Sequence, residues 1–227
     1  GVRGVSLAGA QTSALNFEYQ LCFRCHADSA GLPVPPTNRQ LSQTNTRLEF
    51  ATNNPSHHAV AGPGVNSEVP SLIAPLTASS TIKCTDCHNN NNGPGAGAGG
   101  PAGPHGSSFP NLLERRYETA DNTPEGAAVF ALCYKCHDRN TVLNGGPEKV
   151  HKKHLDDEDT PCNVCHDPHG ISATQGNSFN NAHLINFDTD VVSPSNGRLR
   201  FEKLGSNRGR CFLVCHGKDH DPFIYPD

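Results

Sequence analysis

All ten cysteines of this 227-residue chain belong to five short motifs in which a histidine directly follows the second cysteine. Four motifs have the form Cys-x-x-Cys-His, and the fifth, Cys-x-x-x-Cys-His, is one residue longer. They begin at Cys22, Cys84, Cys133, Cys162 and Cys211. Because no cysteine is left over, the fold has to be built around whatever these five motifs bind.

The spacing of the motifs indicates covalent haem. The cysteine pairs are Cys22 and Cys25, Cys84 and Cys87, Cys133 and Cys136, Cys162 and Cys165, and Cys211 and Cys215. The histidines that follow them are His26, His88, His137, His166 and His216. Two such thiols can add to the two vinyl groups of one haem, and the adjacent imidazole can bind its iron as the proximal ligand. The motifs therefore predict five c-type haems, with a wider loop between the two thioether bonds of the longer motif.

Other uses of paired cysteines fit less well. Zinc sites do not require a histidine after every second cysteine, and disulfide frameworks do not repeat such close pairs. Thioredoxin-like pairs occur once per domain, beside a βαβ pattern that this chain lacks.

The composition is poor in the large apolar side chains of an ordinary protein core. Hydrophobic residues make up 34% of the chain, tryptophan and methionine are absent, and there are 22 glycines and 18 prolines. Such a chain can hardly offset the entropy lost when its backbone is ordered. Haems held by thioether bonds and iron ligands would act both as core and as cross-links. We therefore expect a multihaem cytochrome c, mostly coil with a few short helices and very little strand, in a single haem-organised domain over 1–227.

Charge and hydropathy narrow the classes of partner. The net charge of −4 gives no reason to expect nucleic-acid binding, and no segment is long and apolar enough to predict a membrane span. The chain begins Gly-Val-Arg-Gly, without a signal sequence. Because haem is attached to such motifs outside the cytoplasmic membrane, we expect a mature exported chain, extracellular or at the outer cell surface, with the periplasm as the alternative.

Internal repeats divide the chain into three expected units, 13–110 with two haems, 120–172 with two haems and 180–227 with one. Leu21 to His26 matches Leu132 to His137, and a helical pattern precedes each, over 13–21 and 123–132. The second motif of each two-haem unit is followed by Pro-His-Gly, at His105 and at His169. A glycine-rich insertion at 89–101 separates His105 from its motif, and we expect it to be a mobile surface loop.

The other eight histidines supply candidates for the second, distal iron ligand. The absence of methionine excludes Met/His ligation, and a haem with two histidine ligands transfers electrons at low potential. The repeats favour His58, His105, His154, His169 and His183, with His151 and His220 as further candidates. The candidates outnumber the irons, so at least one is not a ligand. For His57 we favour a role other than binding iron.

Three segments resemble the exported multihaem cytochromes of metal-respiring microbes, including outer-surface cytochromes that polymerise into electron-conducting filaments. They are Cys-x-x-Cys-His-Asp-Pro-His-Gly at 162–170, Ala-His-Leu-Ile-Asn-Phe at 182–187 and Cys-His-Gly-x-x-His at 215–220. The resemblance implies bis-histidine haems in a continuous chain. In filament-forming members it also implies a homopolymer in which one subunit donates an axial histidine to the next.

Electron transfer through five low-potential haems is the function that these observations favour, with redox partner proteins or extracellular acceptors as partners and with no catalytic residue. A filament subunit and a discrete periplasmic or surface shuttle are both open. A multihaem oxidoreductase needs one haem with an open coordination position, for which the longer motif is the candidate. Haems that serve only as scaffold are a third alternative.

Overall fold

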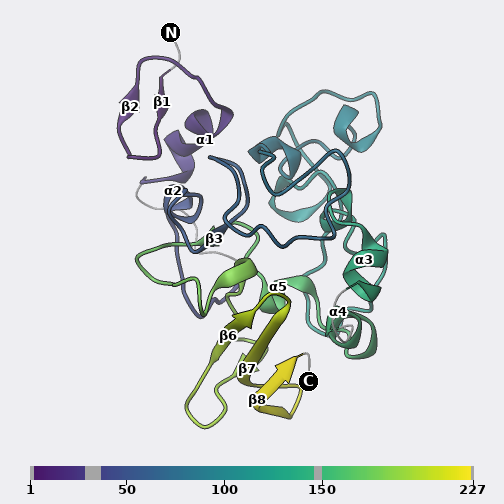
Figure 1. Ribbon diagram of the computed structural model, residues 1–227. Coiled ribbons are helices and arrows are strands. Elements are labelled where there is room, and N and C mark those ends of the chain that lie inside the picture. The colour runs from purple at the N-terminus through teal and green to yellow at the C-terminus, as the bar shows by residue number, and fades with distance from the viewer. Residues whose placement is uncertain (1–2, 29–36, 146–149, 226–227) are drawn as a thin grey trace. The chain divides into compact units, whose positions relative to one another are not determined.

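The computed structural model describes residues 3–28, 37–145 and 150–225. The chain forms two compact units (Figure 1). The first unit comprises 1–68, 78–81 and 162–227, and the second comprises 69–77 and 82–161. These boundaries differ from those of the three predicted haem units. Whether bound haems organise the chain into one domain with such units stays a prediction.

The first unit begins with a small hairpin and a helix that runs into the first motif. Strands β1 (Gly4–Val5) and β2 (Gln11–Thr12) pair in antiparallel fashion, and α1 covers Glu18–His26. The helix starts later than the pattern at 13–21 suggested. Its N-cap is Phe17, and the Gln20 side chain accepts from the backbone N–H groups of Phe17 at 3.2 Å and of Asn16 at 2.8 Å. Its buried face carries Phe23, which is 1% exposed. Cys22 and Cys25 therefore lie on a helix that is anchored by its buried face.

The middle of the first unit joins segments that lie far apart in the sequence. Strand β3 (Ser56–His57) pairs with β4 (Gly170–Ile171), with His57 opposite Gly170. The helical elements here are α2 (Thr46–Glu49), α5 (Cys162–Cys165) and the 3-10 turn η7 (Ala182–Leu184). Gly170 has a φ of +153°, and a side chain there would meet the backbone of Glu49 and His57. The fold therefore needs glycine where the Pro-His-Gly segment meets β3.

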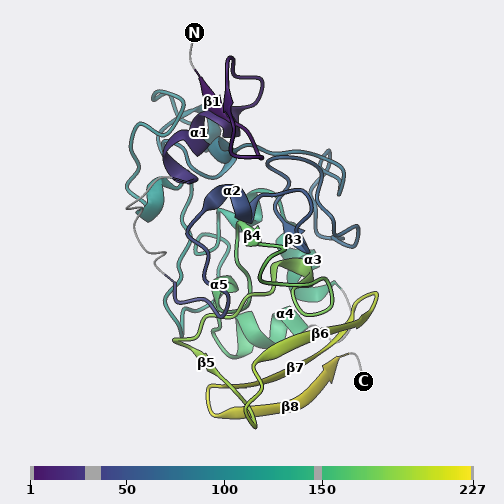
Figure 2. The same cartoon turned by 90° about the vertical axis from the view of Figure 1, so that its left-hand side faces the viewer.

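A β-sheet closes the first unit at the C-terminal end of the chain. Its strands are β5 (Val192–Ser193), β6 (Arg200–Gly205), β7 (Arg208–Cys215) and β8 (Lys218–Tyr225). Strands β5 and β6 pair with successive parts of β7, and β8 pairs with β7 as well (Figure 2). The expectation of very little strand is therefore wrong. The physical reason is that β7 pairs with β6 on one side and with β8 on the other, through turns with residues of positive φ at Asn207 and Gly217.

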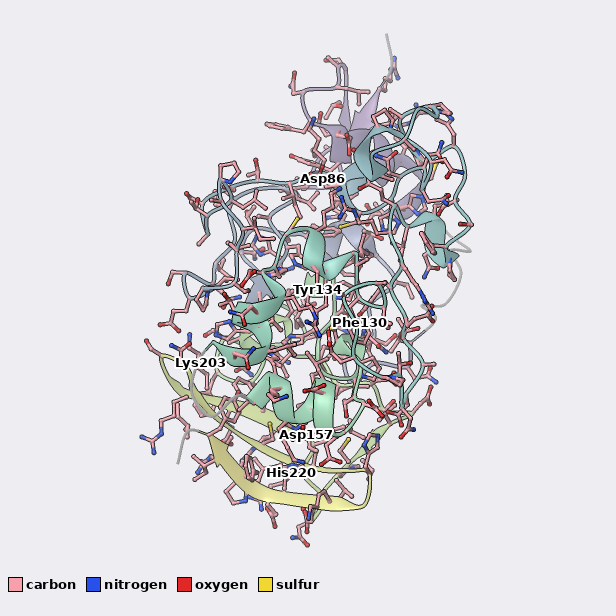
Figure 3. The ribbon with its side chains drawn as sticks, turned by 90° about the vertical axis from the view of Figure 1, so that its right-hand side faces the viewer. Asp86, Phe130, Tyr134, Asp157, Lys203 and His220 are labelled. Atoms are coloured by element: carbon pink, nitrogen blue, oxygen red, sulfur yellow. The ribbon has the colours of Figure 1, made fainter. Side chains whose placement is uncertain are left out.

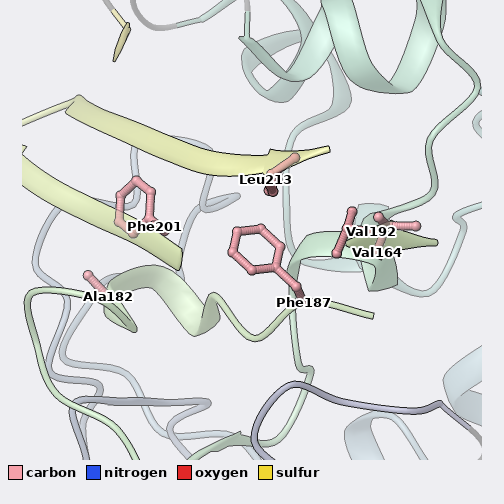
Figure 4. Close-up of a cluster of buried hydrophobic side chains, with 6 residues drawn as sticks. All are labelled: Val164, Ala182, Phe187, Val192, Phe201 and Leu213. Carbon is pink, nitrogen blue, oxygen red and sulfur yellow. The ribbon is translucent and has the colours of Figure 1, made fainter. Parts of the chain in front are cut away.

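One apolar cluster holds this sheet against the fourth motif. It consists of Val164, Ala182, Phe187, Val192, Phe201 and Leu213 (Figure 4). Cys165, Cys211 and Cys215 pack against the same cluster. Three of the four cysteines of the last two motifs therefore pack against one core.

The second unit is mostly turns and short helices. Its elements are η1 (Cys84–Asp86), η2 (Pro94–Ala96), η3 (Pro110–Leu112), η4 (Cys133–Lys135), α3 (Arg139–Asn144), α4 (Val150–Lys152) and the π-helical η6 (Lys153–Asp157). Asp138 caps α3 by accepting from the backbone N–H of Thr141 at 2.7 Å. Among the described residues of the chain, no helix is long and apolar enough to cross a membrane.

The helix predicted over 123–132 does not form. The segment is a series of turns whose backbone also pairs with the preceding chain: Glu118 N–H donates to the carbonyl of Val129, and Leu132 N–H donates to that of Arg116. The Leu132 bond uses an amide that a helix would have bonded internally. Phe130 is fully buried within these turns. Tertiary pairing thus overrides the local helical pattern.

Asparagine side chains hold the glycine-rich insertion together. The Asn89 carbonyl oxygen accepts from the backbone N–H of Gly103 at 2.7 Å, and the Asn90 amide donates to the carbonyl of Pro101 at 3.0 Å. Asn91 exchanges two hydrogen bonds with Ser108. The asparagine run is therefore a set of turn-forming anchors for the segment that carries His105.

Candidate haem-binding site

The four regular motifs share one local conformation. In three of them the histidine N–H donates to the carbonyl of the first cysteine, at 2.8 Å for His88, 3.0 Å for His137 and 2.9 Å for His166. The Cys22 motif lies within α1. Helical residues three apart lie on one face, with about 5–6 Å between their Cβ atoms. Each regular motif therefore presents both thiols on the same side of a single turn, as attachment to one haem requires.

Three short segments, which we call straps, cross three of these motifs. They are 69–73 over the Cys133 motif, 110–114 over the Cys84 motif and 182–186 over the Cys162 motif. In every strap the last residue donates its N–H to the carbonyl of the motif's second cysteine: Ile73 to Cys136 at 2.9 Å, Glu114 to Cys87 at 2.8 Å and Asn186 to Cys165 at 2.9 Å.

The third residue of each strap completes the arrangement. Its carbonyl accepts from the residue that follows the proximal histidine, at 2.6 Å in the first strap, 2.9 Å in the second and 2.8 Å in the third. One backbone geometry thus recurs three times, although the first strap precedes its motif in the sequence and the other two follow theirs. The sequence repeats did not reveal it, because its hydrogen bonds to the motif backbone come from the strap's own main chain.

The straps bind the proximal histidines through Nδ1. His88 Nδ1 lies 2.8 Å from the carbonyl oxygen of Asn111, and His166 Nδ1 lies 2.8 Å from that of His183. His137 Nδ1 lies 2.9 Å from the hydroxyl oxygen of Ser71. A carbonyl can only accept, so Nδ1 carries the proton and Nε2 is the basic nitrogen. That is the tautomer of an imidazole which binds a metal through Nε2 and is oriented through Nδ1–H. These motifs therefore fit haem ligation.

Left-handed backbone shapes two of the straps. Asn111 and Leu112 have φ of 59° and 55°, and His183 and Leu184 have φ of 55° and 63°. Bulky residues adopt this conformation only where the surroundings impose it. Here it accompanies the carbonyl that meets the proximal imidazole. The main chain of His183 therefore orients His166, a role that sequence reasoning missed. That the His183 ring is a distal ligand stays a prediction.

The structure brings two distal candidates of the first unit together. His58 N–H donates to the carbonyl of His169 at 3.0 Å, and His58 Nδ1 donates to the carbonyl of Pro168. His169 Nδ1 lies 3.0 Å from a carboxylate oxygen of Glu49. Burial disfavours a charged His169, but the bond to Glu49 outweighs it and raises the pKa of His169. Both rings are held through Nδ1, as the proximal rings are.

In the second unit His154 is held in the same way. His154 Nδ1 donates to the carbonyl of Val150 at 2.8 Å. His105 and His151 are exposed, the first on the loop after the insertion and the second in α4. The second unit thus provides three distal candidates for the Cys84 and Cys133 motifs.

Two further histidines lie on strands of the first unit. His57 is 4% exposed on β3, and burial lowers its pKa, which keeps the ring neutral. His220 lies on β8, opposite Leu213 of β7. Its ring contacts the edge of the Phe223 ring, with 5.5 Å between the ring centroids (His220 is labelled in Figure 3). That His57 does not bind iron and that His220 could do so both stay predictions.

The Cys211 motif differs from the other four. It was expected to form a wider loop, but Cys211–Cys215 lies within β7, and His216 and Gly217 form the tight turn to β8 with φ of 48° and 73°. Four residues of extended strand span about 13 Å, more than twice the distance across a helical turn. In this conformation the fifth motif does not present its thiols as the regular motifs do.

Thiols of different motifs lie close together. Burial, together with the nearby Cys136, raises the pKa of Cys87 to about 12. Burial likewise raises the pKa of Cys165 to about 12, with Cys211 and Cys215 as its neighbours. Buried thiols with raised pKa values are poor metal ligands and poor nucleophiles. Within the described ranges, no three His, Cys, Asp or Glu side chains form a metal-ion site.

Comparison with known proteins agrees with this geometry. A family model described as a doubled CXXCH motif matches residues 74–142, which contain the Cys84 and Cys133 motifs and the strap at 110–114. No curated protein and no solved structure matches the chain. The motifs indicate covalently bound haem c and fit haem-based electron transfer. The match thus points to the multihaem c-type cytochromes as the class that this chain resembles.

Proposed function

We propose that this protein transfers electrons through covalently bound c-type haems, one at each of its five motifs, without substrate chemistry. The observation that carries the proposal is the set of Nδ1 hydrogen bonds on the proximal histidines. Backbone carbonyls hold His88 and His166 in the tautomer that leaves Nε2 basic, and the Ser71 hydroxyl, which can accept in the same way, holds His137. When bound, haem c supplies a one-electron iron couple whose potential depends on its axial ligands and their hydrogen bonds.

We propose bis-histidine ligation of these haems. His58, His154 and His169 support it, because each donates Nδ1–H to a carbonyl or a carboxylate and thus has the tautomer of the proximal histidines. The supply of histidines is sufficient in both units. The first unit has four candidates for three motifs, and the second has three for two.

Haem attachment at the fifth motif requires a local change. Cys211 and Cys215 have to leave the extended conformation of β7 before they can bond to one haem. Mass spectrometry of the intact protein and its peptides tests this step and the haem count together. We expect all five cysteine pairs to carry haem. Free thiols at a regular motif would overturn the proposal, and free thiols at Cys211 and Cys215 alone would reduce the number of haems to four.

We further propose that the chain is exported and exchanges electrons with redox proteins or extracellular acceptors. Covalent haem attachment outside the cytoplasmic membrane supports export. Two forms fit the proposal, a subunit of an extracellular filament and a discrete shuttle. Electron microscopy of the purified protein separates them, because a polymer gives continuous filaments and a shuttle gives compact particles.

A further inference from the structure

A lysine of the third motif reaches into the second. Lys135 lies between Cys133 and Cys136, and its Nζ donates to the backbone carbonyl of Asp86 at 2.6 Å. Asp86 lies between Cys84 and Cys87 (Figure 3 labels Asp86 and Tyr134, one from each motif). The two haem-binding turns of the second unit are therefore in direct contact.

A buried carboxylate holds this lysine in place. Lys135 Nζ lies 2.7 Å from an oxygen of Glu114, whose side chain is 1% exposed. Glu114 closes the strap of the Cys84 motif, and its second carboxylate oxygen accepts from the Asn89 amide at 3.2 Å. A carboxylate removed from water is strongly disfavoured unless a cation compensates its charge. Arg115 is more distant, at 3.7 Å, so Lys135 is the closer cation.

The sulfur atoms of the two motifs share the same surroundings. Cys87 is buried beside Cys136 and Cys133, and each of these neighbours disfavours its thiolate. Every thiol marks an edge of the haem that it carries. The contact between the turns therefore brings the attachment edges of two haems to one place.

We propose that the haems of the Cys84 and Cys133 motifs exchange electrons directly, and that Lys135 and Glu114 form a positioning pair that sets the reduction potentials of both. The inference rests on the proposed function and goes beyond it, because it selects a particular pair of haems. The pair crosses the boundary between two predicted repeat units, since Cys84 falls in 13–110 and Cys133 in 120–172.

The signs of the expected effects follow from charge. Reduction of a haem adds one negative charge, so a nearby cation favours the reduced form and a nearby carboxylate favours the oxidised form. Because Lys135 contacts both motifs, its charge acts on two haems. Glu114 opposes it at the same place.

The test is a redox titration followed haem by haem through NMR resonances of the haem methyl groups. We expect Lys135→Gln to lower the potentials of the Cys84 and Cys133 haems together. The expected change in the ferric-to-ferrous ratio of each haem is about tenfold at a fixed ambient potential, or about 59 mV. Glu114→Gln should raise both potentials, and the double variant should return them close to the starting values. Lys135→Arg, which keeps the charge, should leave them nearly unchanged.

A matched control removes a surface charge from the same unit. Arg116→Gln breaks an exposed pair with Glu118 and should leave the haem potentials unchanged. A Lys135→Gln shift confined to one haem, or shared equally by all haems, would overturn the pairing. So would single variants that shift the potentials in the same direction.

A measurement on the unaltered protein covers the case in which a variant fails to fold. Oxidation of the Cys84 haem should shift the potential of the Cys133 haem more than it shifts the potential of the Cys22 haem or of the Cys162 haem, which are the haems before and after this pair in the sequence. A larger shift of either of those haems would overturn the inference. If haem is missing from the Cys84 or Cys133 motif, the proposed function itself fails.

Discussion

Ser71 contacts a proximal histidine through its side chain. In the other two straps the partner of Nδ1 is a backbone carbonyl, which no substitution removes. Ser71→Ala deletes the hydroxyl 2.9 Å from His137 Nδ1 and leaves the backbone bonds from Asp138 to Ser71 and from Ile73 to Cys136. The variant therefore isolates the orienting hydrogen bond from the fold of the strap.

The contribution of one hydrogen bond sets an upper bound on the magnitude, because the potential responds to the difference in the strength of this bond between ferric and ferrous iron. A hydrogen bond of this kind contributes about 1 kcal/mol, which corresponds to about a fivefold change in an equilibrium constant. The bond to Nδ1–H makes the imidazole a stronger donor and so favours ferric iron. Its loss should raise the potential of the Cys133 haem by at most about 40 mV, at 59 mV for each factor of ten.

The assay is the haem-resolved redox titration, with Ser71→Thr as the control that keeps a hydroxyl. We expect only the Cys133 haem to shift in Ser71→Ala, and Ser71→Thr to stay close to the unaltered protein. Equal shifts in the two variants, or no shift at the Cys133 haem, would refute the role given to the hydroxyl.

Three further predictions concern the frame around the haems. Leu112→Gly should cost less than about 1 kcal/mol in the free energy of unfolding, because glycine accepts the positive φ of this position. Leu113→Ala should cost about 2–4 kcal/mol, because Leu113 is buried. Denaturant unfolding of the haem-loaded protein compares the two variants, and equal losses would contradict the strain argument. Gly217→Ala should destabilise the β7–β8 turn by about 1 kcal/mol because its φ is 73°, and Lys218→Ala is the neighbouring control. The bond from Arg47 lowers the pKa of Asp28, so the Asp28 carboxylate contributes stability above its ordinary pKa of 3.8 and loses it as the pH falls below that value; in Arg47→Gln the pKa of Asp28 measured by carbon NMR should return toward 3.8, and an unchanged pKa would contradict the assignment.

The sequence predicted the haem motifs because cysteine and histidine spacing is visible in the chain itself. It also predicted a helix before Cys22, although the helix begins only at Glu18 and two apolar residues of the pattern, Phe17 and Leu21, are exposed. The prediction of a helix before Cys133 is wrong, because the backbone of 129–132 pairs with that of 116–118. Such pairing depends on distant residues, which a local pattern does not contain.

The straps and the C-terminal sheet show why other parts of the fold and of the site could not be predicted from the sequence. A carbonyl of Asn111 or His183 can orient an imidazole whatever its side chain is, so no residue type marks the role. Bulky residues at positive φ, such as Leu112 and Leu184, are even disfavoured by local rules. The Cys211 motif predicted a haem-binding loop at the position where the structure has strand β7. Phe201, Phe212 and Leu213 are buried in the sheet that forms there, but they do not alternate with polar residues as in a half-buried strand.

The central claim is that the haems transfer electrons with both axial positions occupied by histidine. Absorption and electron paramagnetic resonance spectra of the ferric protein, followed by carbon monoxide addition after reduction, test it most directly. Bis-histidine ligation predicts low-spin signals for every haem and no spectral change with carbon monoxide. A high-spin fraction, together with a carbon monoxide adduct at one haem, would contradict it and favour an oxidoreductase with an open iron.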